Sequence, residues 1–282
     1  QLLLNSPSDI HPRSWICIRG KNISWIFKKL EKGALVNYKT NRENLSKRIA
    51  SELNCGTGAI KRLFQDGNRF YPIPVILRLL EMNKNAEKII EKINNNAEFL
   101  KVNSASAKPI KALRKVSINL AKILGAFMAD GSLSIQIIIA APETKSLGKI
   151  IRRVNKLKIN HSRGRSRSRK QNYLSFNINE SNFYLLDEIV SYAIASEYLV
   201  QTHYNFDLTD EYRDNVEKFN YWMAQEFGIK PTNFIKRGNA WRTIFTNIIL
   251  AGYLIKFFQA MPGPKTYTAC EPELIQKSEI TI

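Results

Sequence analysis

The sequence predicts an α+β protein, in which a helical N-terminal domain precedes a domain of helices and antiparallel strands. Three observations predict it. Helical spacing of apolar residues dominates the first 110 residues, a polar Ser/Ala/Lys/Pro stretch lies near residue 105, and the order strand, helix, strand, strand, helix then occurs twice. A chain of 282 residues is long enough for about two domains. We therefore expect domains at 1–105 and 106–282.

The stretch NRENLSKRIASELNCGTGAIKRLFQDG has the spacing of a helix-turn-helix at about residues 43–66. Leu45 and Ile49 would face inward from the first helix, a short turn with two glycines follows, and Ile60 would face inward from the second helix. This pattern resembles the repressor-type helix-turn-helix family. The alternative is a small helical packing module with a solvated basic face.

The outer face of the second helix would carry Thr57, Lys61, Arg62 and Gln65. A recognition helix meets base edges and phosphates with such a face. We expect these side chains to contact DNA.

Beyond residue 105, SINLAKILGAFMADGSL (residues 117–133) is predicted to be a helix that ends at Asp130. Its small residues Gly125, Ala126 and Ala129 would let another backbone approach closely, so we expect a second helix against it. A carboxylate in such a seam needs a partner, and a divalent cation is one candidate.

Two rounds of one pattern follow this helix. The strand 133–141 is apolar and β-branched, and Pro142 opens an amphipathic helix. Gly228 is expected to cap the helix of the second round. The other predicted elements are strands 161–171 and 172–179, helix 180–193, strand 203–210, helix 211–228, strands 232–238 and 240–246, and helix 247–258.

Arginine alternates strictly with small residues in SRGRSRSRK, where it occupies positions 163, 165, 167 and 169. In a strand, Arg163, Arg165, Arg167 and Arg169 would line one face, and a two-stranded ribbon fits the major groove of DNA. The alternative is a flexible basic loop that makes unspecific phosphate contacts. The second round has Lys236, Arg237 and Arg242 at the corresponding place, which suggests a saddle whose two sheets face DNA.

The net charge supports a polyanionic partner. Lys and Arg total 43 against 24 Asp and Glu, a formal charge of +19. No apolar stretch approaches the roughly 20 residues that span a bilayer, so nucleic acid is favoured over a membrane. The three cysteines and three histidines are scattered, which argues against a disulfide framework or a zinc site and for an intracellular setting, cytoplasm or nucleoid.

The stretch ILGAFMADG (residues 123–131) resembles the signature of the LAGLIDADG homing endonucleases, at Gly125, Ala129, Asp130 and Gly131. The resemblance covers roughly residues 117–275. It implies an αββαββα-like saddle with antiparallel sheets and site-specific, metal-dependent cleavage of double-stranded DNA. In this family the acid that ends each of two packed helices binds a divalent metal.

The resemblance assigns Asp130 as a catalytic metal ligand, with the Gly131 carbonyl as a possible second ligand. Mg²⁺, or Mn²⁺, suits such an oxygen site. Lys265, near the end of the last helix, is a candidate to stabilise developing charge, by position alone.

No second good copy of the motif occurs in the sequence, although the family needs two acid-tipped helices. Three interpretations stay open: a homodimer, an enzyme whose second LAGLIDADG half is missing, and a non-catalytic DNA-binding protein or transcriptional regulator that retains the scaffold. RNA processing is a weaker possibility, because basic charge alone does not distinguish RNA from DNA.

Overall fold

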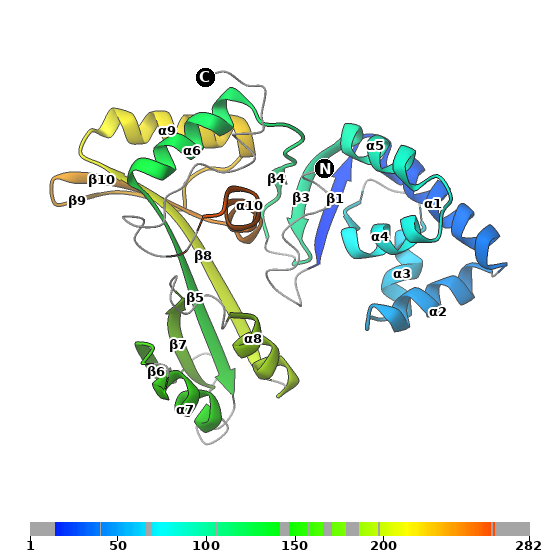
Figure 1. Cartoon of the computed structure of the whole chain (residues 1–282), viewed down its shortest axis with the longest axis horizontal. Helices are drawn as coiled ribbons and strands as arrows, with labels where there is room; N and C mark the ends of the chain where they lie inside the picture. The colour runs from blue at the N-terminus through cyan, green and yellow to red at the C-terminus, as the bar shows by residue number, and fades with distance from the viewer. Residues whose placement is uncertain are drawn as a thin grey trace. The chain divides into compact units, whose positions relative to one another are not determined.

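The computed structural model of the chain divides into two compact units, residues 15–115 and 116–262, each described by itself (Figure 1). It describes residues 15–39, 41–65, 69–104, 107–141, 147–156, 158–165, 171–178, 186–196, 198–260 and 262. The mixed helices and antiparallel sheets confirm the α+β class.

The first unit combines helices with a small antiparallel sheet. Its described elements, in chain order, are β1 (Ile16–Gly20), α1 (Ile23–Tyr38), α2 (Arg42–Glu52), α3 (Thr57–Leu63), β2 (Tyr71–Pro72), α4 (Ile73–Glu81), α5 (Ala86–Asn96), β3 (Ala97–Val102) and β4 (Ile110–Lys111).

The sheet of the first unit has the strand order β2-β1-β3-β4. Helices dominate this region, as predicted, but the strands on either side of them, including the one that follows the helix α5, were not predicted. The helix ends at Asn96, and the next six residues pair with β1, which lies some 80 residues earlier in the chain. Because β4 pairs with β3, residues 107–115 belong to the first unit, and the division falls beyond residue 105.

The second unit contains the predicted pattern of strand, helix, strand, strand, helix twice, after an opening helix. Its described elements are α6 (Ile118–Asp130), β5 (Gly131–Ala141), α7 (Gly148–Lys156), β6 (His161–Arg165), β7 (Asn172–Ile178), α8 (Leu186–Ala195), β8 (Leu199–Asp210), α9 (Arg213–Phe227), β9 (Asn233–Arg237), β10 (Ala240–Thr246) and α10 (Ile248–Phe258).

The two rounds share one sheet, not two. The described strands have the order β6-β7-β5-β8-β10-β9, so the first strands of both rounds pair antiparallel at the centre, from Gly131 opposite Leu208 to Ala140 opposite Leu199. The two long central strands are conspicuous in Figure 1. The expected pair of sheets was wrong because a backbone ladder joins β5 to β8, and local sequence carries no signal for such long-range pairing.

One face of this sheet is apolar and covered by helices. Along β5 every second residue from Leu133 to Ala141 is buried, as a half-covered strand requires. The helices α6 and α9 lie side by side and contact β8 (Figure 1). Phe127 of α6 lies 4.7 Å, between ring centroids, from Phe206, which lies 5.6 Å from Phe219 of α9. We call this the covered face.

Local signals fix the ends of these helices. The Ser117 hydroxyl accepts a hydrogen bond from the Leu120 amide at 3.0 Å and donates one to Glu226 of α9 at 2.6 Å, so it both caps α6 and ties it to its neighbour. Gly228 ends α9 with a φ of 68°, which confirms the predicted cap.

Candidate nucleic-acid interface

The second face of the six-stranded sheet is mainly polar, and we call it the polar face. Residues that are paired across neighbouring strands lie on the same face, so the strand registers determine which residues belong to it. It carries hydroxyl, amide and imidazole side chains over β5, β7, β8 and β10: Ser132, Ser134, Gln136, Ser175, Asn177, Gln201, His203, Asn205, Thr209 and Thr246. Side chains that donate and accept hydrogen bonds in this way suit the edges of bases and the oxygens of phosphates.

A buried carboxylate holds part of the polar face together. Asp207 of β8 is 4% exposed, accepts a hydrogen bond from the Ser132 hydroxyl of β5 at 3.0 Å, and accepts one from Nη2 of Arg242 of β10 at 3.0 Å. The Nε atom of Arg242 is also buried and has no hydrogen-bond partner among the described residues. This cluster therefore ties three strands together.

The predicted basic strand residues are distributed over both faces. Arg237 and Arg242 lie on the polar face, whereas Lys236 lies on the other face, opposite Trp241. Lys236 and Arg237 are exposed, but Arg242 is half-buried and paired with Asp207.

Arg163 and Arg165 share one face, as the alternation predicts, and both are exposed. They lie on the edge strand β6, and their ladder partners on β7 are Leu174 and Asn172. Because these partners belong to the covered face, Arg163 and Arg165 lie on the covered face as well and not on the polar face. Arg167 and Arg169 lie outside the described residues.

The helix α6 presents an exposed stripe of residues with the spacing of one helix face, namely Ile118, Lys122, Gly125 and Ala129. Ile118 is 62% exposed, and a Cβ at Gly125 would meet nothing within 4 Å. The expected second helix is present, since α9 packs against α6, but Gly125 and Ala129 are exposed and this stripe has room for a further helix.

Asp130 ends this helix and is exposed, directly before the strand that forms the centre of the sheet. Gly131 opens that strand and pairs with Leu208. A Cβ at Gly131 would lie 2.8 Å from the Cα of Phe127, so only glycine fits where the chain turns from helix to strand.

A metal at Asp130 would need ligands beyond the carboxylate, imidazole and thiol groups of the described residues. No group of three or more His, Cys, Asp or Glu side chains gathers in the described residues. An exposed carboxylate next to a main-chain carbonyl nonetheless fits Mg²⁺, which binds through one or two carboxylates together with water and phosphate oxygens. Lys265 lies outside the described residues.

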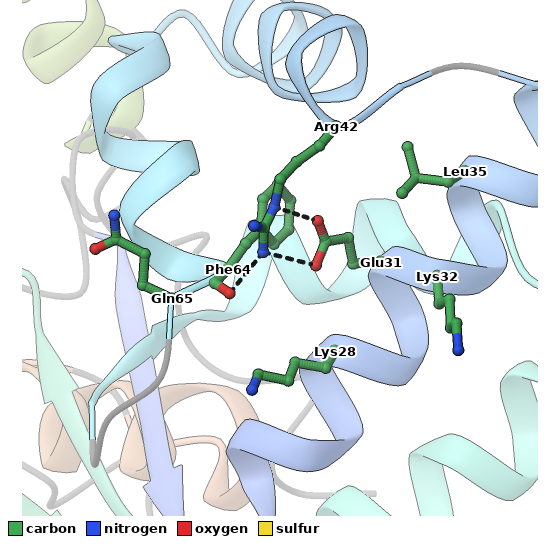
Figure 2. Close-up of a pocket in the computed structure, with 7 residues that line it drawn as sticks. All are labelled: Lys28, Glu31, Lys32, Leu35, Arg42, Phe64 and Gln65. Carbon is green, nitrogen blue, oxygen red and sulfur yellow. Dashed lines mark hydrogen bonds and ion pairs between the residues drawn. The ribbon is translucent and has the colours of Figure 1, made fainter.

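In the first unit, one arginine fixes the helix pair α2 and α3 to α1. Arg42 pairs with Glu31 of α1 at 2.7 Å and donates to the carbonyl of Phe64, after α3, at 2.7 Å (Figure 2). This arrangement lies in a cavity of about 750 Å³, which Lys28 and Lys32 also line. Figure 2 shows the lining side chains. Burial raises the pKa of the Glu31 carboxyl, and Arg42 partly opposes that rise.

The structure brings the predicted contact residues of α3 to its surface. Thr57, Lys61 and Arg62 are exposed, while Ile60 is fully buried. Lys61 lies 3.4 Å from the carboxylate of Glu43 on α2, so part of its charge is compensated locally.

Two features were missed from the sequence. The polar face has a visible signal, since Ser132, Ser134 and Gln136 alternate with apolar residues in β5. The pairing of Asp207 with Arg242 has none, because it depends on the register of β8 against β10.

Comparison with models of known protein families gave no match, and comparison with curated protein sequences gave none either. Among the described helices, none has the length and apolar character that crossing a membrane requires.

Proposed function

We propose that the chain is a site-specific double-stranded DNA endonuclease of the homing-endonuclease type, which hydrolyses phosphodiester bonds with a divalent metal. The observation that carries the proposal is the exposed carboxylate of Asp130, at the end of a helix with an exposed small-residue face and at the head of the central strand. The formal charge of +19 and the hydrogen-bonding side chains of the polar face support DNA as the partner.

In this proposal, different residues of the chain bind the metal and position the DNA. Asp130 would hold the metal by a carboxylate oxygen, with the Gly131 carbonyl as its candidate second ligand. The chemistry that Mg²⁺ or Mn²⁺ would supply there is polarisation of the scissile phosphate and activation of a water. Arg237 and the amides and hydroxyls of the polar face position the duplex, and α3 extends the recognised site through Thr57 and Arg62.

The missing second acid is supplied, in this proposal, by a second copy of the chain. The stripe of Ile118, Gly125 and Ala129 is exposed, and small residues allow two helices to approach closely. Two copies packed through α6 would bring two Asp130 carboxylates to one seam. A separate protein half that carries the second motif is the alternative source.

A non-catalytic DNA-binding regulator is the second candidate function, and one observation favours it. The helix α8 holds the place in the second round that α6 holds in the first, and it ends at Ala195 rather than at a carboxylate. Of these two corresponding helices, only α6 therefore ends at a carboxylate.

Incubation with a randomised duplex library and Mg²⁺ separates the two functions. The control variants are Asp130→Asn and Asp214→Asn, the latter at an exposed acid in the first turn of α9. Sequence-specific cleavage that Asp130→Asn loses and Asp214→Asn keeps supports the nuclease. Specific retention without cleavage by the unaltered chain refutes it and supports the regulator.

A further inference from the structure

A groove of about 390 Å³ in the first unit lies beside α3 and belongs to none of the features predicted from the sequence. Arg62 of α3 lines it, together with Lys101 of β3 and the aromatic side chains of Trp15 and Phe70. No Asp or Glu lines it in the described part of the chain.

The strands behind the groove present their cations on one face. Cys17 pairs with Lys101 and Arg19 pairs with Phe99, so these four side chains lie on the same side of the sheet. The other side is buried, with Ile18 fully covered. On the groove side Cys17 is also buried, but Arg19, Phe99 and Lys101 are half-buried, so the groove lies on the more exposed side of the sheet.

Aromatic rings hold one of these cations in place. The guanidinium carbon of Arg19 lies 4.7 Å from the ring centroid of Phe70 and 5.3 Å from that of Phe99, and Lys101 Nζ lies 5.8 Å from Phe70. No carboxylate of the described residues lies within ion-pair distance of Arg19 or Lys101. Their positive charge is consequently available to a ligand, and the guanidinium is already oriented.

The groove also contains the thiol of Cys17, which gives no reason to expect covalent or metal chemistry there. Burial raises the pKa of Cys17 to about 12, so the side chain is a neutral thiol at physiological pH. It is neither a nucleophile nor a metal ligand in that form.

We propose that this groove binds the sugar-phosphate backbone of the DNA duplex proposed to contact α3. Lys101 and Arg62, which line the groove, and Arg19, which lies beside them on the same side of the sheet, bind the phosphates. Arg62 belongs both to the exposed surface of α3 and to the groove, so one bound strand can pass from one to the other. The inference rests on the proposed DNA binding and extends it to a surface outside the helix pair.

The salt dependence of binding tests the proposal. Each phosphate contact contributes ~0.9 to the slope of log affinity against log salt. In the full chain with EDTA and a fluorescein-labelled duplex of mixed sequence, Lys101→Gln is expected to lower the slope by ~0.9, and Arg19→Gln with Lys101→Gln by ~1.8. Lys88→Gln, at an exposed lysine of α5, is the matched control and leaves the slope unchanged.

Thermal unfolding of each variant accompanies the titrations, and Lys101→Gln alone decides the matter if the double variant fails to fold. An unchanged slope in Lys101→Gln overturns the proposal. A loss confined to single-stranded oligonucleotides also overturns it, in favour of a single-strand site.

The experiments test the groove proposal and the nuclease proposal separately. Cleavage by the unaltered chain together with unchanged salt slopes in the variants refutes the groove proposal alone. A reduced salt slope in Lys101→Gln without any cleavage refutes the nuclease proposal and supports the groove proposal.

Discussion

The pair of Asp207 and Arg242 gives the most quantitative prediction, because it separates a structural arginine from a DNA contact. Arg242→Ala would leave the Asp207 side chain, 5% exposed, with the Ser132 hydroxyl as its remaining described partner. Removing one partner of a fully buried pair costs ~3–5 kcal/mol. Because the Arg242 side chain is 28% exposed and therefore partly hydrated, we expect a smaller loss of about 2 kcal/mol.

Adding Asp207→Asn to Arg242→Ala removes the uncompensated charge, so about 1 kcal/mol of the loss should return. Native-state hydrogen exchange of β8 and β10 measures both changes, and 2 kcal/mol corresponds to about 30-fold faster exchange. The double variant should keep the salt slope of DNA binding, whereas Arg237→Gln should lower it by ~0.9. A loss of stability below about 0.5 kcal/mol in Arg242→Ala, or no recovery in the double variant, would refute the structural role of the Asp207–Arg242 pair.

Four further predictions concern the two units. Gly131→Ala should lower stability by ~1–3 kcal/mol, because the new Cβ would meet the backbone of Phe127. Gly125→Ala has open space around its Cβ and should be neutral or stabilising in thermal unfolding. Equal effects of the two substitutions would contradict this geometry. Gly125→Leu should weaken self-association in analytical ultracentrifugation while Gly125→Ala retains it, and a dimer that survives the leucine would place the seam elsewhere. Arg42→Ala should destabilise the first unit by about 2 kcal/mol, because it leaves a buried carboxylate and a carbonyl unpaired. Burial raises the pKa of Glu31 above its ordinary value of 4.5, so the contribution of this carboxyl group to stability is greatest below that pH and is lost as the pH rises through the folded pKa. Glu31→Gln should consequently stabilise the unit at pH 7 and lose this advantage near pH 4 in denaturant titrations, and an advantage independent of pH would contradict that sign.

The second unit was largely predictable because its signals are local. The β-branched run predicts β5 by its spacing, and Gly228 predicts the end of α9 by its backbone conformation. The same holds for α6, where Ser117 caps the first turn and the apolar spacing runs to Asp130.

The features that the sequence did not reveal depend on pairings between distant residues. The strands β1 and β3 are short, and they are recognisable only once Ile18 lies opposite Leu100. The alternation of Arg163 and Arg165 predicts a shared face, but the register of β6 on β7 decides which face that is. The partner of Arg242 likewise follows from register, not from spacing.

The two-copy metal site is tested most directly by mixed dimers on a supercoiled plasmid that carries the selected target. Differently tagged unaltered and Asp130→Asn chains are co-expressed, and the species with one copy of each is purified. We predict that the unaltered dimer linearises the plasmid in Mg²⁺, that the mixed dimer stops at the nicked circle, and that the dimer with two altered copies leaves it intact. Linear product from the mixed dimer at the unaltered rate, or any specific cleavage without Asp130, would contradict the account.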